Sequence, residues 1–93
     1  MADVTVSVQC VPLCADPYPV VDEAIAVIRA SGVMHEVTPM ETVMQGDLDA
    51  LLEVVKAAHR RCLEAGADKV LTFVKISGAA SGSTIDDKMA KYR

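Results

Sequence analysis

The sequence predicts an α+β fold in which two helices pack on one face of an antiparallel sheet. Two segments carry apolar residues at helical spacing, and each ends at a glycine suited to a helix C-terminus. The segments around them are rich in β-branched residues and have the pattern of strands. At 93 residues the chain is long enough for one hydrophobic core, so we expect a single domain over residues 1–93.

The first predicted strand, residues 3–13, has one apolar and one polar face. Its apolar face carries Val4, Val6, Val8 and Cys10, and its polar face carries Thr5, Ser7 and Gln9. Asp16-Pro17 then starts a helix, because proline fits the first helical position, where its missing N–H is not needed. Ser31-Gly32 ends this helix.

The segment 34–46 is extended and mixes strand-forming residues with polar ones. Pro39 is compatible with an edge strand or a bulge but not with a fully paired central strand. We therefore expect either two short strands in a hairpin around residues 39–42 or one bent strand. The mixture of polar and apolar side chains indicates a surface that meets either a second protomer or a small ligand, and the residues alone leave both open.

A second helix and a last strand follow. Asp47 caps a helix whose apolar stripe ends at Ala65-Gly66. Residues 69–77 are apolar on both faces, which is typical of a central strand covered on both sides. Residues 78–83 form a flexible loop in this interpretation, and residues 84–93 form a short C-terminal helix.

The predicted order of strand, helix, strand, strand, helix and strand is the ferredoxin-like arrangement. Its helices cover one face of the sheet and leave the other face with both polar and apolar side chains. An apolar content of 52% is high for so small a chain, so we expect it to oligomerise through its sheet.

The amino-acid composition limits the kinds of partner that we expect this chain to bind. The net charge of −4 argues against nucleic acid, because binding phosphates requires a basic face. We expect no membrane partner and no targeting segment, and hence a cytoplasmic protein. Cys10, Cys14 and Cys62 are expected to be free thiols, since none has a partner at metal-ligand spacing. No metal and no cofactor is expected.

Several segments carry a resemblance to a known family. They are Val11-Pro12-Leu13, the hairpin from Thr38 to Gly46, Lys56-Ala57-Ala58-His59, and Gly66-Ala67-Asp68-Lys69-Val70. On these residues the chain resembles the YkoF-like family of thiamine- or hydroxymethylpyrimidine-binding proteins over essentially its whole length. The resemblance implies a ferredoxin-like domain that assembles into dimers or tetramers and binds a pyrimidine-type ligand beside its sheet.

The ligand-binding residues expected from this resemblance are Ser7, Gln9, Met40, Glu41, Thr42, Gln45 and Lys75. Two of them depart from the family, which usually has glycine in place of Glu41 and often has glutamate in place of Gln45. Glu41 either supplies the charge that Gln45 lacks or faces solvent. Catalytic residues are not expected.

Each of these residues also has a structural interpretation. Ser7 and Gln9 could bond across an interface, Thr42 could be an ordinary strand residue, and Lys75 could pair with a carboxylate. His59 is expected to make a structural hydrogen bond.

The two other classes of function are an enzyme and a structural or regulatory oligomer. An acylphosphatase needs an arginine in the first loop to hold phosphate, and Cys14-Ala15-Asp16-Pro17 contains none, so we expect no enzyme. The alternative to a binding protein is a structural or regulatory oligomer with no small-molecule ligand.

Overall fold

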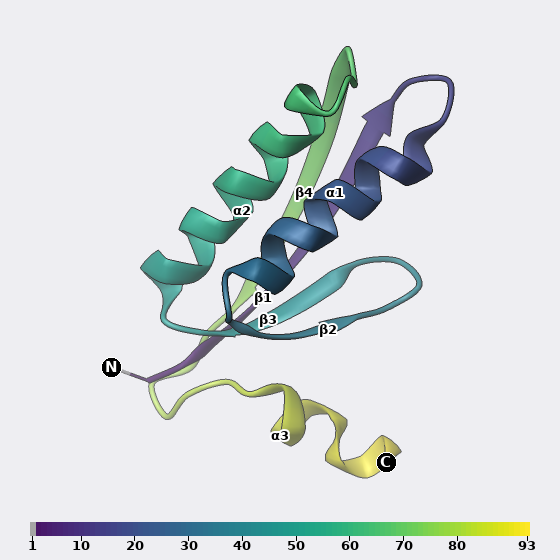
Figure 1. The fold of residues 1–93 in the computed structure, drawn as a ribbon. Helices are drawn as coiled ribbons and strands as arrows, with labels where there is room; N and C mark the ends of the chain where they lie inside the picture. The colour runs from purple at the N-terminus through teal and green to yellow at the C-terminus, as the bar shows by residue number, and fades with distance from the viewer. Residues whose placement is uncertain (1) are drawn as a thin grey trace.

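The computed structural model describes residues 2–93 and shows the elements in the predicted order (Figure 1). They are β1 (Val4–Leu13), α1 (Pro17–Ala30), β2 (Met34–Val37), β3 (Thr42–Gly46), α2 (Leu48–Glu64), β4 (Lys69–Ser77) and α3 (Ile85–Met89). A 3-10 helical turn, Ala90–Tyr92, follows α3.

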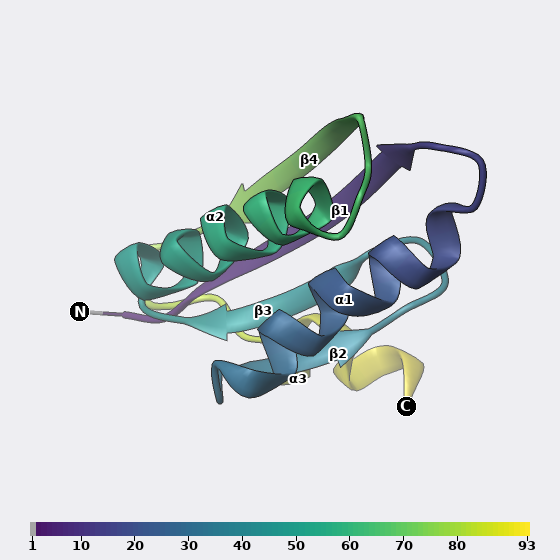
Figure 2. The same cartoon turned by 45° about the horizontal axis from the view of Figure 1, so that its top comes forward.

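The strands form one four-stranded sheet in the order β2-β3-β1-β4, with every pair antiparallel. Both α1 and α2 lie on the same face of it (Figures 1 and 2). This is the ferredoxin-like arrangement, so the predicted fold class is confirmed. We call the sheet face away from α1 and α2 the open face.

The extended segment 34–46 is a hairpin, the first of the two predicted forms. Its turn is fixed by Thr38, whose backbone N–H donates to the carbonyl oxygen of Glu41 at 2.9 Å. The Thr38 hydroxyl also donates to that carbonyl, at 2.6 Å, and accepts from the Glu41 N–H at 3.1 Å. Three hydrogen bonds therefore hold Glu41 in place at the end of the turn.

The helix boundaries follow local chemistry. Pro17 is the first residue of α1, although the side chain of Asp16 makes no capping hydrogen bond. Asp47 does cap α2, where its carboxylate accepts from the Ala50 N–H at 3.1 Å. Gly66 follows α2 with φ of 109°, a conformation that favours glycine.

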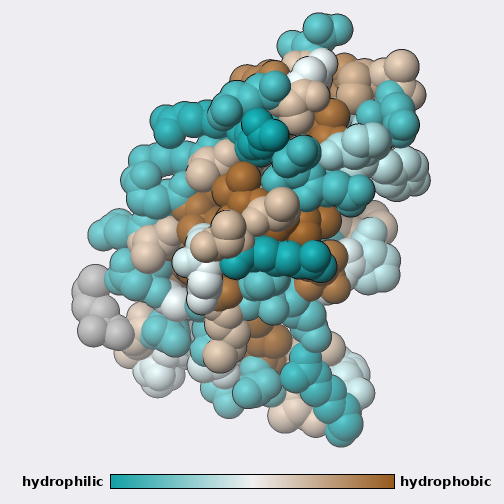
Figure 3. All heavy atoms as spheres, viewed as in Figure 1, coloured by the Kyte–Doolittle hydropathy of each residue, from teal (hydrophilic) through white to brown (hydrophobic). Residues whose placement is uncertain are grey.

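The core lies between the helices and the inner face of the sheet. Its most deeply buried large side chains are Val6, Met44, Leu51 and Cys62. From the helix side, apolar atoms gather in the middle of the face and polar atoms cover most of its margins (Figure 3). No helix within residues 2–93 combines the length and apolar character needed to cross a bilayer.

The prediction that the last strand lies at the centre of the sheet was wrong. Within residues 2–93, β4 pairs only with β1 and is an edge strand. Several of its apolar side chains are exposed, and Phe73 is the most exposed of them at 56%. Apolar residues on both faces of a strand indicate that both faces are suited to burial. The pattern does not distinguish burial by the same chain from burial by another chain.

The C-terminal segment crosses to the open face. Figure 2 shows α3 behind β2 and β3, on the side of the sheet opposite α1. The Ser83 N–H donates to the Asp3 carbonyl at 2.8 Å, and Thr84 caps α3 by accepting from the Asp87 N–H at 3.1 Å. Ile85 is buried, so this short helix is docked on the sheet.

Candidate functional site

A hollow of about 280 Å³ lies on the open face and is bounded at one side by α3. Its volume is close to the lower end of the range for small-molecule sites. We call it the open-face cavity. It is lined by Thr5, Ser7, Glu41, Val43, Lys75, Ile76, Ser77 and Lys88.

One end of the open-face cavity is built around Glu41. The sheet register places Ser7 of β1 directly opposite Lys75 of β4. The Lys75 ammonium lies 3.3 Å from each carboxylate oxygen of Glu41. The Glu41 side chain is 24% exposed and Ser7 is buried, whereas the Lys75 side chain is 76% exposed, so a half-buried carboxylate and a buried hydroxyl meet an ammonium from the solvent side.

The electrostatics of this cluster favour the charged form of Glu41. The Ser7 hydroxyl is the largest cause that lowers the pKa of Glu41, and Lys75 lowers it further by a hydrogen bond and by its charge. Partial burial acts in the opposite direction but does not prevail. Glu41 is therefore an anion at neutral pH.

The other end of the cavity carries hydroxyls and a lysine. The Lys88 ammonium donates to Ser77 Oγ at 2.8 Å. Ser77 Oγ lies 3.3 Å from Ser83 Oγ, which in turn lies 3.1 Å from Thr5 Oγ1. Thr5 ends this chain by donating to the Ser83 carbonyl at 3.0 Å.

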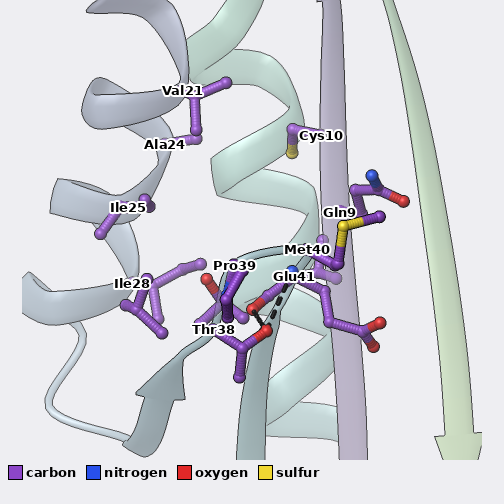
Figure 4. Close-up of a pocket in the computed structure, with 13 residues that line it drawn as sticks. Gln9, Cys10, Val21, Ala24, Ile25, Ile28, Thr38, Pro39, Met40 and Glu41 are labelled. Atoms are coloured by element: carbon purple, nitrogen blue, oxygen red, sulfur yellow. Dashed lines mark hydrogen bonds between the residues drawn. The ribbon is translucent and has the colours of Figure 1, made fainter. Parts of the chain in front are cut away.

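A second cavity, of about 100 Å³, lies between α1 and the β2–β3 turn (Figure 4). Its walls are mostly apolar, with Val21, Ala24, Ile25 and Ile28 of α1 on one side. The Glu41 carboxylate and the Gln9 amide both point away from α1 (Figure 4). At about 100 Å³ this space is well below the size of small-molecule sites, and the Thr38 hydroxyl beside it is already bonded to the Glu41 backbone, so it is better explained as imperfect packing.

The structure separates the seven predicted binding residues into three groups. Ser7, Glu41 and Lys75 meet in the open-face cavity. Gln9, Met40 and Thr42 line the second cavity, where Thr42 is buried and pairs with Val8, and Glu41 lies between the two cavities and lines both.

Gln45 lines neither cavity. Its side-chain oxygen accepts from the Ile85 N–H at 2.9 Å, and its amide nitrogen donates to Asp3 at 3.4 Å. Within the described residues, its contacts tie β3 to α3.

Three polar residues of the open-face cavity were missed by sequence reasoning, namely Thr5, Ser77 and Lys88. Thr5 and Ser77 could have been found, because each lies two residues from a predicted site residue on the same face of its strand. Lys88 gave no such signal, since its position depends on where α3 docks.

The expected structural role of His59 is confirmed. Its Nδ1 lies 2.6 Å from Thr72 Oγ1, and Thr72 Oγ1 lies 3.9 Å from the Cys10 sulfur.

The three cysteines are free thiols. Burial and the neighbouring Cys10 raise the pKa of Cys62 to about 12. Across residues 2–93 we find no cluster of three or more His, Cys, Asp or Glu side chains arranged to hold a metal ion.

The amino-acid sequence of this chain is similar to those of known proteins. Residues 6–93 match the sequence profile of a family described as thiamine-binding protein. A UPF0045 protein of Clostridium perfringens is 47% identical over 90 residues, which cover 95% of each chain.

Solved structures agree with this match. A domain of unknown function, DUF77, from Bacillus cereus is 48% identical, with a TM-score of 0.95 over 99% of this chain and 91% of that one. A Thermotoga maritima protein provisionally assigned to thiamine biosynthesis or salvage is 34% identical, with a TM-score of 0.89 over 98% of this chain and 99% of that one.

Proposed function

Since the chain belongs to the thiamine-binding protein family, we propose that it binds thiamine or its hydroxymethylpyrimidine moiety in the open-face cavity. In this proposal it is a homo-oligomer that works in the cytoplasm without catalysing a reaction. Free thiols at Cys10, Cys14 and Cys62 suit that reducing compartment.

The observation that carries the proposal is the half-buried Glu41 carboxylate, held between Ser7 and Lys75. An aminopyrimidine offers an amino group that donates hydrogen bonds and ring nitrogens that accept them. A carboxylate beside a hydroxyl and an ammonium provides the complementary acceptors and donors. The anionic carboxylate would also attract the positive thiazolium ring of thiamine.

The same geometry favours binding over catalysis. The possible base beside the Ser7 hydroxyl in this cluster is Glu41, whose pKa is lowered. A carboxylate with a lowered pKa is a weak general base at neutral pH, so it activates a serine poorly. His59 is already bonded to Thr72 on the helix side of the sheet.

Self-association is supported by the uncovered apolar side chains of β4 and the open face. Leu13, Leu71, Phe73 and Val74 are exposed, and in the described part of the chain one edge of the nine-residue strand β4 is unpaired. Exposed apolar surface on an open strand edge favours association with another chain. A second copy of this chain is the occupant we propose, because the same surface on both partners gives a closed dimer.

The alternative function is a structural or regulatory oligomer with no small-molecule ligand. It is favoured by the same exposed strand and would leave the Glu41–Lys75 pair as an ordinary surface ion pair. Isothermal titration calorimetry with thiamine and with hydroxymethylpyrimidine separates the two functions. Saturable binding at micromolar concentration, about −8 kcal/mol, supports the binding protein, and heats equal to dilution for both ligands support the alternative.

The variant that links binding to the site is Glu41→Gln, which keeps the shape of the side chain and removes its charge. We expect it to weaken binding about tenfold or more, because a hydrogen bond to a charged group contributes about 1.5–3 kcal/mol. Glu53→Gln is the matched control, because Glu53 is an exposed carboxylate paired with Lys56 on α2, on the other face of the sheet. Equal loss in both variants would reject the open-face cavity as the site.

A further inference from the structure

We propose that the open-face cavity is built for a phosphate monoester of its pyrimidine-type ligand, with Lys88 and Ser77 as the phosphate-binding residues. This inference rests on the proposed function, because it assigns the second end of the same cavity. It identifies the ligand as one with a ring near Glu41 and a phosphate near Lys88.

The first support is the charge of Lys88. Its ammonium makes one hydrogen bond, to Ser77 Oγ, and no carboxylate within residues 2–93 lies in ion-pair distance of it. Lys75, the other cation of the cavity, is paired with Glu41. An ammonium has three donors, so two donors of Lys88 remain for a ligand oxygen.

The second support is the direction of the hydroxyl chain. Thr5 donates to the Ser83 carbonyl, so its oxygen is free to accept from Ser83, and Ser83 can accept from Ser77. The weakest connection is between Ser77 and Ser83, at 3.3 Å. The Ser77 hydroxyl can therefore turn from Ser83 toward a phosphate oxygen and form a shorter, charge-assisted bond.

The third support is the distance between the two ends of the cavity. Lys75 and Ser77 lie two residues apart on β4, which places them roughly 7 Å apart on the same face of the strand. A phosphate ester on a substituent of a pyrimidine ring spans a comparable length. The negatively charged Glu41 carboxylate lies at the end of the cavity that would hold the ring, away from the phosphate, and is paired there with Lys75.

Calorimetry with matched pairs of ligands tests this inference. Thiamine is compared with thiamine monophosphate, and hydroxymethylpyrimidine with its phosphate, against the full-length protein. We expect at least one phosphate ester to bind roughly tenfold to a hundredfold tighter than its unphosphorylated partner, as for other hydrogen bonds to charged groups. Lys88→Gln should remove this difference, so that the phosphate ester binds no more tightly than its unphosphorylated partner.

Two control variants and one control ligand make the test specific. Lys88→Arg should retain the preference, and so should Lys91→Gln, because Lys91 stacks on Tyr92 outside the cavity. Inorganic phosphate alone should bind far more weakly than the esters, because it lacks the ring.

The outcomes are distinct. Equal affinity for both members of each pair overturns the phosphate site but leaves the proposed function standing. A preference that survives Lys88→Gln, or inorganic phosphate binding as tightly as the esters, also overturns it. Absence of binding by all four ligands rejects the proposed function itself.

Discussion

The side-chain oxygen of Gln45 accepts a hydrogen bond from the backbone N–H of Ile85 at 2.9 Å. This contact joins the end of β3 to the start of α3 across 40 residues of chain. A five-residue helix is too short to be stable alone, so its position depends on such contacts. Because α3 carries Lys88 into the open-face cavity, Gln45 affects the site without lining it.

Gln45→Ala should therefore release α3 from the sheet. We expect the Ile85 amide to exchange its hydrogen faster and the free energy of unfolding to fall by about 1 kcal/mol. Gln45→Glu keeps an acceptor oxygen and should retain the protection of that amide. Unchanged exchange at Ile85 in the alanine variant would contradict this role.

Ser7→Ala should raise the pKa of Glu41 toward its ordinary value, because the Ser7 hydroxyl is the largest cause of the lowered pKa. Carboxyl chemical shifts followed over pH by NMR measure this directly. A lowered pKa means that Glu41 contributes stability above the pKa of an unfolded glutamate and loses it as the pH falls through the folded pKa. The acid limb of a stability curve should then flatten in Ser7→Ala, and an unshifted pKa would exclude the hydroxyl as the cause.

The Cys62 thiol should resist alkylation in the native protein, because its pKa is raised to about 12 and the side chain is fully buried. The folded protein holds this proton more tightly than the unfolded chain. The thiol therefore favours folding fully below about pH 8.5, and that contribution is lost as the pH rises toward 12. Mass spectrometry after alkylation, with and without urea, checks the first statement, and rapid native labelling of Cys62 would refute it.

Met44 and Met40 form a matched pair for the core, at 0% and 69% exposed. Met44→Ala should reduce the free energy of unfolding by about 2–5 kcal/mol, because it leaves a cavity among packed side chains. Met40→Ala should change it by about 0.5 kcal/mol or less. Urea denaturation of both variants measures the two changes in the free energy of unfolding. Similar changes for both variants would show that Met44 is not a core residue.

The proposed oligomer predicts that Phe73→Asp shifts the protein to monomer in sedimentation velocity, since Phe73 is an exposed apolar residue of β4. Leu63→Asp is the control, because Leu63 is exposed to a similar degree but lies on α2. A monomeric wild type, or equal dissociation by both variants, would rule out an interface centred on β4.

Much of the fold was predictable because local chemistry marks its boundaries. Proline at the start of α1, the Asp47 cap of α2 and the period-two alternation of β1 are all properties of neighbouring residues. The edge position of β4 was not predictable from its own residues, because an apolar strand can be covered by its own chain or by another.

The site was only partly predictable. Ser7, Glu41 and Lys75 were expected from the family resemblance, and the alternation along the strands also places Ser7 and Lys75 on one face of the sheet. Gln45 and Lys88 were misassigned or missed, because their roles depend on long-range docking of α3, which no local pattern encodes.

The most direct test of the account is to map thiamine binding on the protein by NMR. Amide chemical shifts should move for Ser7, Val43 and Lys75 and for residues of α3, all on the open face, and stay constant along the outer surfaces of α1 and α2. Shifts confined to Ile25, Ile28 and Thr38, which line the smaller cavity beside α1, or no shifts at saturating thiamine, would contradict it.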